Sequence, residues 1–202
     1  MKIVPKVLLI CGIISSILYV AVDAVASSLY AGYSFTSQGF SELWVFGSPV
    51  RPFFLPLIVV RDVFLFAFTL GVWISADKNR ALQVTALMFI GDNVVGLVTP
   101  IFFPPPSSLH FPLTGVEVVF ILLAMAFGAA AFRSWFRFYS VGALLVLIVT
   151  GFWGSMQASH FAAGESVPWF GVIERILIYG YLLWVAVLAI VLLRAEKRRG
   201  GL

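Results

Sequence analysis

Six long apolar stretches constrain the fold of this chain more than any other feature of its sequence. A helix that crosses the hydrocarbon core of a membrane needs roughly 20 predominantly apolar residues. Six segments meet this requirement: 5–26, 52–75, 81–103, 112–132, 138–157 and 169–193. The 202 residues are 61% hydrophobic and 11% charged, whereas a soluble domain usually carries about 25% charge. We therefore predict an all-α, polytopic membrane protein, in which one domain over residues 1–202 forms a six-helix transmembrane bundle.

The distribution of Lys and Arg predicts the orientation of the bundle. With six spans, ten of the thirteen Lys and Arg residues fall on one side of the membrane. They are Lys2, Lys6, Lys78, Arg80, Arg133, Arg137, Arg194, Lys197, Arg198 and Arg199. The loops on the opposite side contain only Arg51. The positive-inside rule then predicts that both termini are cytoplasmic. The positive charge flanks helices in short segments, which argues against nucleic acid as a partner.

The connection between the first two spans is long enough to contain structure of its own. It includes the sequence YSFTSQGFSELWVF (33–46), which predicts a short amphipathic helix at the membrane interface with Phe40, Leu43 and Trp44 on one face. Ser37 can cap this helix. Connections of this length are often functional, so the segment can act as a lid over the bundle; the alternative is a helix that only lies at the interface.

Both histidines of the chain fall on the side opposite the termini. His110 ends the proline-rich loop 104–111, and His160 lies in the loop 159–170. A metal site made of these two and a carboxylate such as Glu42 is chemically possible, but no H-x-x-x-H or H-E-x-x-H spacing supports it. The sequence also lacks a lysine inside a span for a retinal Schiff base and a nucleophile elbow. We therefore predict no metal and no cofactor.

Charged residues inside the apolar spans point to a polar site within the membrane. The sequence VVRDVFLF (59–66) contains Arg61 and Asp62 side by side, and Glu174 and Arg175 are neighbours in the sixth span. A charge at mid-bilayer costs at least about 2.5–3.5 kcal/mol. Adjacent residues of a helix point about 100° apart, so Arg61 and Asp62 are poorly placed to pair with each other. We therefore expect the cross-pairs Arg61–Glu174 and Asp62–Arg175, whose members have similar depths.

The acids in the spans outnumber the arginines. Asp92 and Glu117 share the depth of these pairs, whereas Asp23 lies at the end of the first span and can reach the lipid headgroups. Five acids and two arginines give a net charge of −3, which is costly in a medium of low dielectric constant. The excess favours a cavity over ion pairs that only fix packing. The predicted cavity residues are Arg61, Asp62, Asp92, Glu117, Glu174 and Arg175. The residues predicted at its mouth are Ser37, Ser41, Glu42, His110 and His160.

Two classes of function remain open for such a cavity. One is the binding or transport of a membrane lipid, a small amphiphile or a cation. The other is an intramembrane enzyme, such as a lipid-directed hydrolase or isomerase with or without a metal. The sequence singles out no catalytic residue, and it contains no signal for an oligomeric state. Membrane lipid is the one partner that the composition implies.

Four stretches of the chain also resemble a known family. They are GYSFTSQGFSEL (32–43), RPFFLPLIVVRDVFLFAFTLGVW (51–73), the proline segment ending in His110, and IERILIYGYLLWVAVLAIVLLR (173–194). They resemble a family of prokaryotic multi-pass membrane proteins catalogued as domain of unknown function 998. The resemblance implies a compact helical bundle in a prokaryotic plasma membrane, and it implies no activity. The matching positions that it favours as site residues are Ser37, Ser41, Glu42, His110, Glu174 and Arg175.

Overall fold

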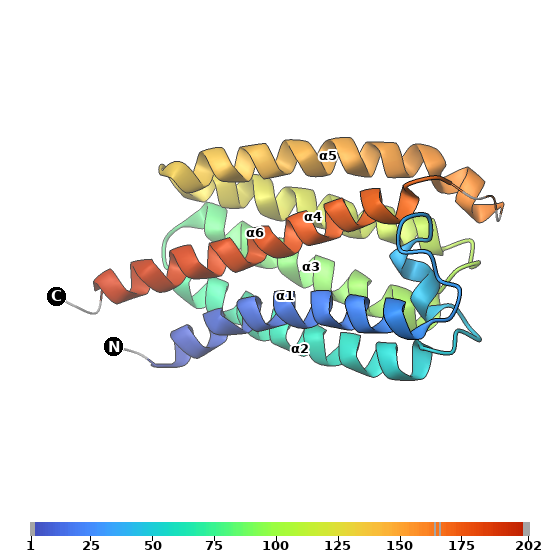
Figure 1. The fold of residues 1–202 in the computed structure, drawn as a ribbon. Coiled ribbons are helices and arrows are strands. Elements are labelled where there is room, and N and C mark those ends of the chain that lie inside the picture. The colour runs from blue at the N-terminus through green and yellow to red at the C-terminus, as the bar shows by residue number, and fades with distance from the viewer. Residues whose placement is uncertain (1–2, 164, 166, 200–202) are drawn as a thin grey trace.

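The computed structural model describes residues 3–163, 165 and 167–199, and within them six α-helices form a bundle (Figure 1). In chain order they are α1 (Ile3–Leu29), α2 (Arg51–Ala76), α3 (Arg80–Phe102), α4 (His110–Ala131), α5 (Trp135–Ala162) and α6 (Phe170–Arg199). Each contains a segment that is long and apolar enough to cross a membrane. No strand occurs in the described residues. The protein is therefore an all-helical, multi-pass membrane protein.

The six helices form a closed ring. Each helix packs against the next one in the chain, and α6 also packs against α1. The beginning of α1 and the end of α6 lie at the same end of the bundle, which we call the termini end (Figure 1). The segment 30–50, the loop 103–109 and the described residues of the connection between α5 and α6 lie at the opposite end, which we call the lid end. Helix α5 is the least buried of the six, and it packs mainly against α4 and α6.

Helix boundaries follow local signals in most places. Helix α3 begins after Asn79, whose side chain accepts a hydrogen bond from Leu82 N at 3.2 Å, as is typical of an N-cap. Helix α2 begins with Pro52 in its first turn, where the missing N–H costs nothing. The prediction that His160 lies in a loop is wrong, because α5 continues to Ala162. An apolar window ends where polar residues begin, and a helix can extend beyond that point.

The short helix predicted within 33–46 is present as a 3-10 helix, η1 (Phe40–Trp44). Gly39 precedes it and donates its N–H to the Glu42 carboxylate at 2.8 Å, so the carboxylate serves the backbone of its own segment. Ser37 does not cap this helix, because its hydroxyl donates to Ser34 Oγ at 2.8 Å.

Aromatic rings fill the termini-end half of the bundle. Phe89 packs edge-on against Phe68, with ring centroids 5.4 Å apart. Its ring is tilted against that of Trp184, with centroids 6.1 Å apart. Glycines make room for these rings: a Cβ on Gly12 would lie 2.6 Å from the Phe68 ring, and one on Gly128 would lie 2.6 Å from the Trp184 ring. Such small residues let helices approach closely in membranes. This half of the bundle is therefore densely packed.

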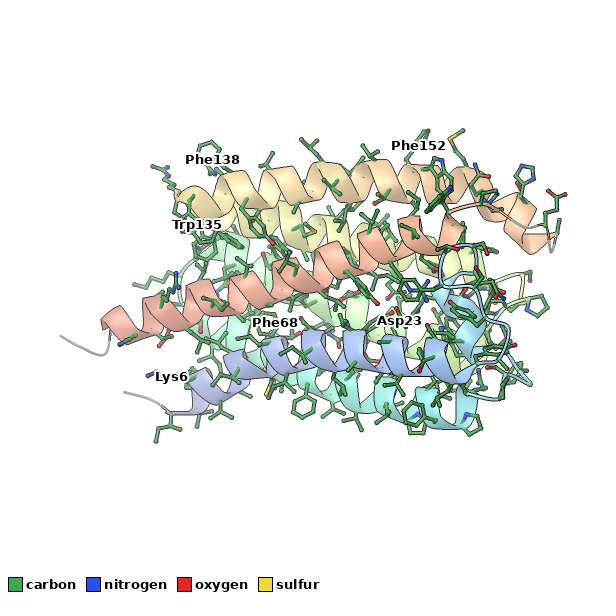
Figure 2. The ribbon with its side chains drawn as sticks, viewed as in Figure 1. Lys6, Asp23, Phe68, Trp135, Phe138 and Phe152 are labelled. Carbon is green, nitrogen blue, oxygen red and sulfur yellow. The ribbon has the colours of Figure 1, made fainter. Side chains whose placement is uncertain are left out.

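The outer surface of the bundle is apolar. Phe138 is 79% exposed, and its side chain points away from the bundle along α5 (Figure 2). Soluble monomers rarely expose large contiguous apolar patches, whereas a helix that faces lipid does. Asp23 does not face outward, because it lies on the side of α1 that faces α6 (Figure 2).

Candidate functional site

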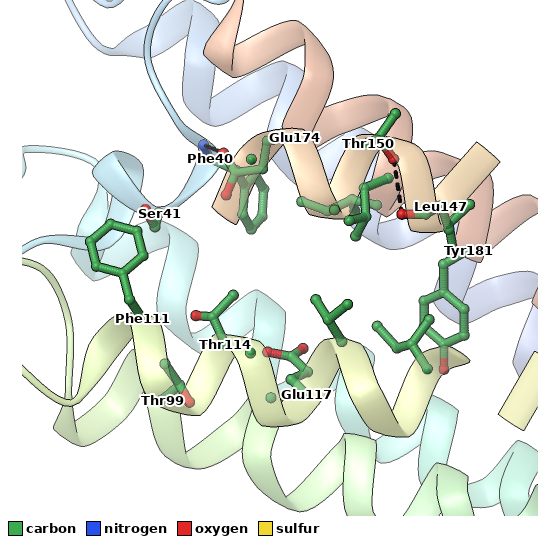
Figure 3. A pocket seen from close by; sticks show the side chains of 18 of the residues that line it. Phe40, Ser41, Thr99, Phe111, Thr114, Glu117, Leu147, Thr150, Glu174 and Tyr181 are labelled. Carbon is green, nitrogen blue, oxygen red and sulfur yellow. Dashed lines mark hydrogen bonds between the residues drawn. The ribbon is translucent and has the colours of Figure 1, made fainter. Parts of the chain in front are cut away.

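A cavity with a volume of about 760 Å³ occupies the lid-end half of the bundle. All six helices and η1 contribute to its wall, and most of the lining side chains are apolar or aromatic. Figure 3 shows Glu117 from α4 and Glu174 from α6 pointing into the same space. Ser41 lies toward one end of this space and Tyr181 toward the other. The volume is within the range of roughly 300–1,000 Å³ that is typical of small-molecule sites.

The segment 33–46, which we call the lid segment, closes one end of the cavity. Phe40 lines the cavity and stacks on Tyr19 of α1, with ring centroids 4.8 Å apart. Trp44 also lines it and packs edge-on against His110 at 5.2 Å. Phe40 and Trp44 are both more than 90% buried. The apolar face of the lid segment is thus buried against the bundle itself.

Arg175 of α6 ties the lid segment to α1. Its guanidinium donates to both carboxylate oxygens of Asp23, at 2.8 Å and 2.9 Å. The same guanidinium donates to Phe35 O at 3.1 Å and to Tyr33 Oη at 2.8 Å. Burial raises the pKa of Tyr33, so its hydroxyl stays protonated and donates in turn to Gly39 O at 2.8 Å. One buried ion pair therefore anchors three parts of the lid segment.

The first turn of α6 holds the lid segment at two further positions. Glu174 Oε2 accepts a hydrogen bond from Phe40 N at 2.5 Å. Gly171 lies so close to the lid backbone that a Cβ there would be 2.3 Å from Gln38 O. Because a backbone carbonyl cannot rotate away as a side chain can, this close approach requires glycine.

The cross-pairs expected between the second and sixth helices are wrong. Arg61 Nη1 donates to Asp62 Oδ1 at 2.6 Å, and Arg175 binds Asp23 instead of Asp62. The long Arg61 side chain bends back to its neighbour, although the two Cα–Cβ bonds diverge. It also lies over the Tyr19 ring, 4.9 Å from the centroid. Of the two positions that the sequence left open for Asp23, the structure has the inward one, since this residue is 0% exposed.

The structure separates the predicted cavity residues into two groups. Three of them line the cavity: Arg61, Glu117 and Glu174. The other three lie outside its lining and are bound to neighbours: Asp62, Asp92 and Arg175. Asp92 accepts a hydrogen bond at 2.5 Å from Tyr181, which itself lines the cavity. Asp62 and Asp92 thus bind residues that face the cavity, whereas Arg175 binds Asp23 and the lid segment.

The residues predicted at the mouth separate in the same way. Ser41 and His110 line the cavity, whereas Ser37 and Glu42 hydrogen-bond within the lid segment. His160 lies on the surface, with its Nδ1 atom 2.7 Å from the Glu165 carboxylate. Across the described part of the chain, no group of three or more His, Cys, Asp or Glu side chains is arranged to hold a metal ion.

The aromatic part of the wall was not predicted from the sequence. Aromatic side chains line the cavity from five helices and η1: Tyr19, Phe40, Trp44, Phe54, Phe111, Phe152, Phe170 and Tyr181. The face of a helix that lines the cavity can be recognised from the spacing of its residues along the sequence. On α4, His110, Thr114 and Glu117 recur at intervals of three or four residues, which places them on one face.

Comparison with known proteins identifies one family. The model of the family described as "Protein of unknown function (DUF998)" matches residues 13–191. No curated protein and no solved structure matches the chain. The matched range begins within α1 and ends within α6, so it contains the whole lid segment and every lining residue of the cavity.

Proposed function

This chain belongs to the DUF998 family, whose description assigns no activity, and from its cavity we propose that it binds an amphiphile inside the membrane. The cavity is the observation that carries the proposal. It combines an apolar wall of membrane-embedded helices with a few polar side chains, chiefly Arg61, Glu117 and Glu174. An amphiphile satisfies both parts, because its tail buries apolar surface and its head group meets the polar side chains.

The exposed part of the wall supports entry from the lipid phase. The lining residues that are also exposed on the outside include Pro112 and Gly115 of α4 and Phe152 and Ser155 of α5. The lid segment covers the end of the cavity that faces water. A ligand with an apolar tail therefore has a route between α4 and α5, along which the tail stays in lipid.

A photoreactive probe tests this function. We expect dodecanol with a diazirine in its chain, added to the protein in lipid nanodiscs, to label cavity residues such as Ile121 and Leu177. Gly115→Trp should reduce this labelling at least about tenfold, because a Cβ on Gly115 meets no atom within 4 Å and the indole would fill the opening. Mass spectrometry of peptides locates the label.

The matched control is Gly142→Trp. Gly142 is an exposed α5 residue with equally open space around its Cβ, and it does not line the cavity. Labelling of cavity residues should be the same in this variant as in the wild type. Label confined to outward-facing side chains such as Phe138, or cavity labelling that survives Gly115→Trp, would contradict the proposal.

The proposed orientation places both termini in the cytoplasm and the lid end outside, in the plasma membrane of a prokaryote. The ten-to-one distribution of Lys and Arg supports it, as does the position of the ends of α1 and α6 at one end of the bundle (Figure 1). Among the ten residues, Lys2 lies outside the described residues, as do the side chains of Arg198 and Arg199.

Cysteine labelling of intact cells tests the orientation. The buried Cys11 is first replaced by alanine, and a single cysteine is then introduced at one of two exposed positions. We expect Ser108→Cys, at the lid end, to react with a membrane-impermeant maleimide, and Lys78→Cys, at the termini end, to react only after lysis. The reverse pattern would overturn the orientation.

A further inference from the structure

The charges on the cavity wall are unbalanced. Besides His110, the acidic or basic side chains that line it are Arg61, Glu117 and Glu174. The charge of Arg61 is already matched by Asp62, at 2.6 Å. Glu117 has no hydrogen bond or salt bridge to any of the described residues, and Glu174 accepts only the backbone N–H of Phe40. Two carboxyl groups thus face the cavity without a salt bridge to any of the described residues.

The surroundings of these carboxyl groups make the imbalance costly. They lie within electrostatic reach of one another, and both point into a space bounded largely by apolar side chains (Figure 3). Two like charges in a medium of low dielectric constant disfavour the ionised state of both. Arg175 cannot serve as their counter-ion, because its guanidinium is engaged by Asp23 and the lid segment.

His110 provides a second, independent observation. Its side chain lines the cavity, the residue is 3% exposed, and its Nδ1 atom has no hydrogen-bond partner in the described structure. An unpaired buried polar atom costs free energy. A ligand N–H donor would remove that cost once the ring turns its Nδ1 atom, which solvent does not reach in this structure, toward the cavity. His110 and Glu117 are seven residues apart on α4, which places them two turns apart on one face.

The aromatic rings of the wall fit the same ligand. The faces of Tyr, Trp and Phe rings attract cations, and Tyr19, Phe40, Trp44 and Tyr181 all line the cavity. Arg61 already lies over the Tyr19 ring, so the wall contains one cation–π contact of its own. An anionic head group would instead meet two carboxyl groups, and the one lining arginine is already paired.

We infer that the ligand is a long-chain amine, whose protonated ammonium group binds between Glu117 and Glu174. This inference rests on the proposed function, because the apolar wall must hold the tail. The ammonium donates to the two carboxylates. Charge-assisted hydrogen bonds of this kind are about twice as strong as neutral ones.

Competition between matched probes tests the inference in the wild-type protein. The diazirine dodecanol is displaced from nanodisc-embedded protein by dodecylamine, dodecanol or dodecyl phosphate, which share one chain length. We expect dodecylamine to compete at a concentration at least about tenfold lower than dodecanol, and dodecyl phosphate to be the weakest of the three. Equal competition by amine and alcohol, or stronger competition by the phosphate, would overturn the inference.

Variants locate the head group. Glu117→Gln should reduce the preference for amine over alcohol to less than about threefold, because it removes one carboxylate that makes no hydrogen bond in the described structure. Glu165→Gln, an exposed acid at the lid end, should keep the full preference. If Glu117→Gln also kept it, the ammonium site would be excluded. Failure of the proposed function looks different, since the diazirine probe would then not label the cavity at all.

Discussion

Replacing Arg175 with leucine is expected to lower the free energy of unfolding by about 3–5 kcal/mol, because it leaves the Asp23 carboxylate buried without its cation. Asp23 is 0% exposed and Arg175 is 3% exposed, so water cannot replace the lost contact. The same substitution removes the donors that bind Phe35 O and Tyr33 Oη. Equilibrium unfolding in mixed detergent micelles measures the difference.

Two comparisons identify the ion pair as the cause. Arg133→Leu removes an exposed arginine at the termini end, and it should change the free energy of unfolding by no more than about 0.5 kcal/mol. The double variant Asp23→Leu with Arg175→Leu should be more stable than Arg175→Leu alone, because no unpaired buried charge remains. If the free energy of unfolding of Arg175→Leu equalled that of the Arg133→Leu control, the ion pair would not anchor the lid segment.

Gly171→Val is expected to displace the lid segment and expose the end of the cavity. A Cβ at this position would lie 2.3 Å from Gln38 O and 2.6 Å from Phe35 O, and overpacking of this kind costs about 1–3 kcal/mol. The reporter is Ser41→Cys in a Cys11→Ala background, because Ser41 lines the cavity and is 5% exposed. The thiol introduced at position 41 should react about tenfold faster with a small water-soluble thiol reagent. This factor corresponds to a shift of about 1.4 kcal/mol toward the open position of the lid segment.

The control for this experiment is Gly142→Val on α5, where a Cβ meets no atom within 4 Å. It introduces the same side chain into a helix but should leave the labelling rate of the reporter unchanged. An unchanged rate in Gly171→Val would mean that the lid segment does not depend on its close approach to α6.

The lengths of the apolar stretches predicted six helices, because the thickness of a bilayer sets a minimum length for a span. Depth along those helices grouped Glu117 with Glu174, and both line one cavity. Depth did not predict the ion pairs, because it contains no information on how each helix is rotated about its own axis. Arg61 was therefore assigned to the wrong partner, and its actual partner Asp62 depends on the bend of a flexible side chain.

The direction in which a side chain near the end of a span points is not determined by its depth. A carboxylate at the depth of Asp23 can reach lipid headgroups or turn inward, and its sequence position allows both. The face of the helix distinguishes them, since Tyr19, Asp23 and Ser27 are spaced by four residues along α1. The docking of the lid segment was not predictable, because it depends on a backbone approach at Gly171 that only the folded structure specifies.

The dense aromatic packing of the termini-end half closes the cavity on that side. Within the described residues, the rings of Phe68, Phe89 and Trp184 pack together beyond Tyr181 and Leu182, the last residues of α6 that line the cavity. If the proposed route between α4 and α5 is used, the ligand enters and leaves by it, and we expect exchange with a single leaflet. Passage of a ligand to the other leaflet would require the three packed rings to move together. This packing therefore supports a ligand-binding protein more than a channel across the membrane.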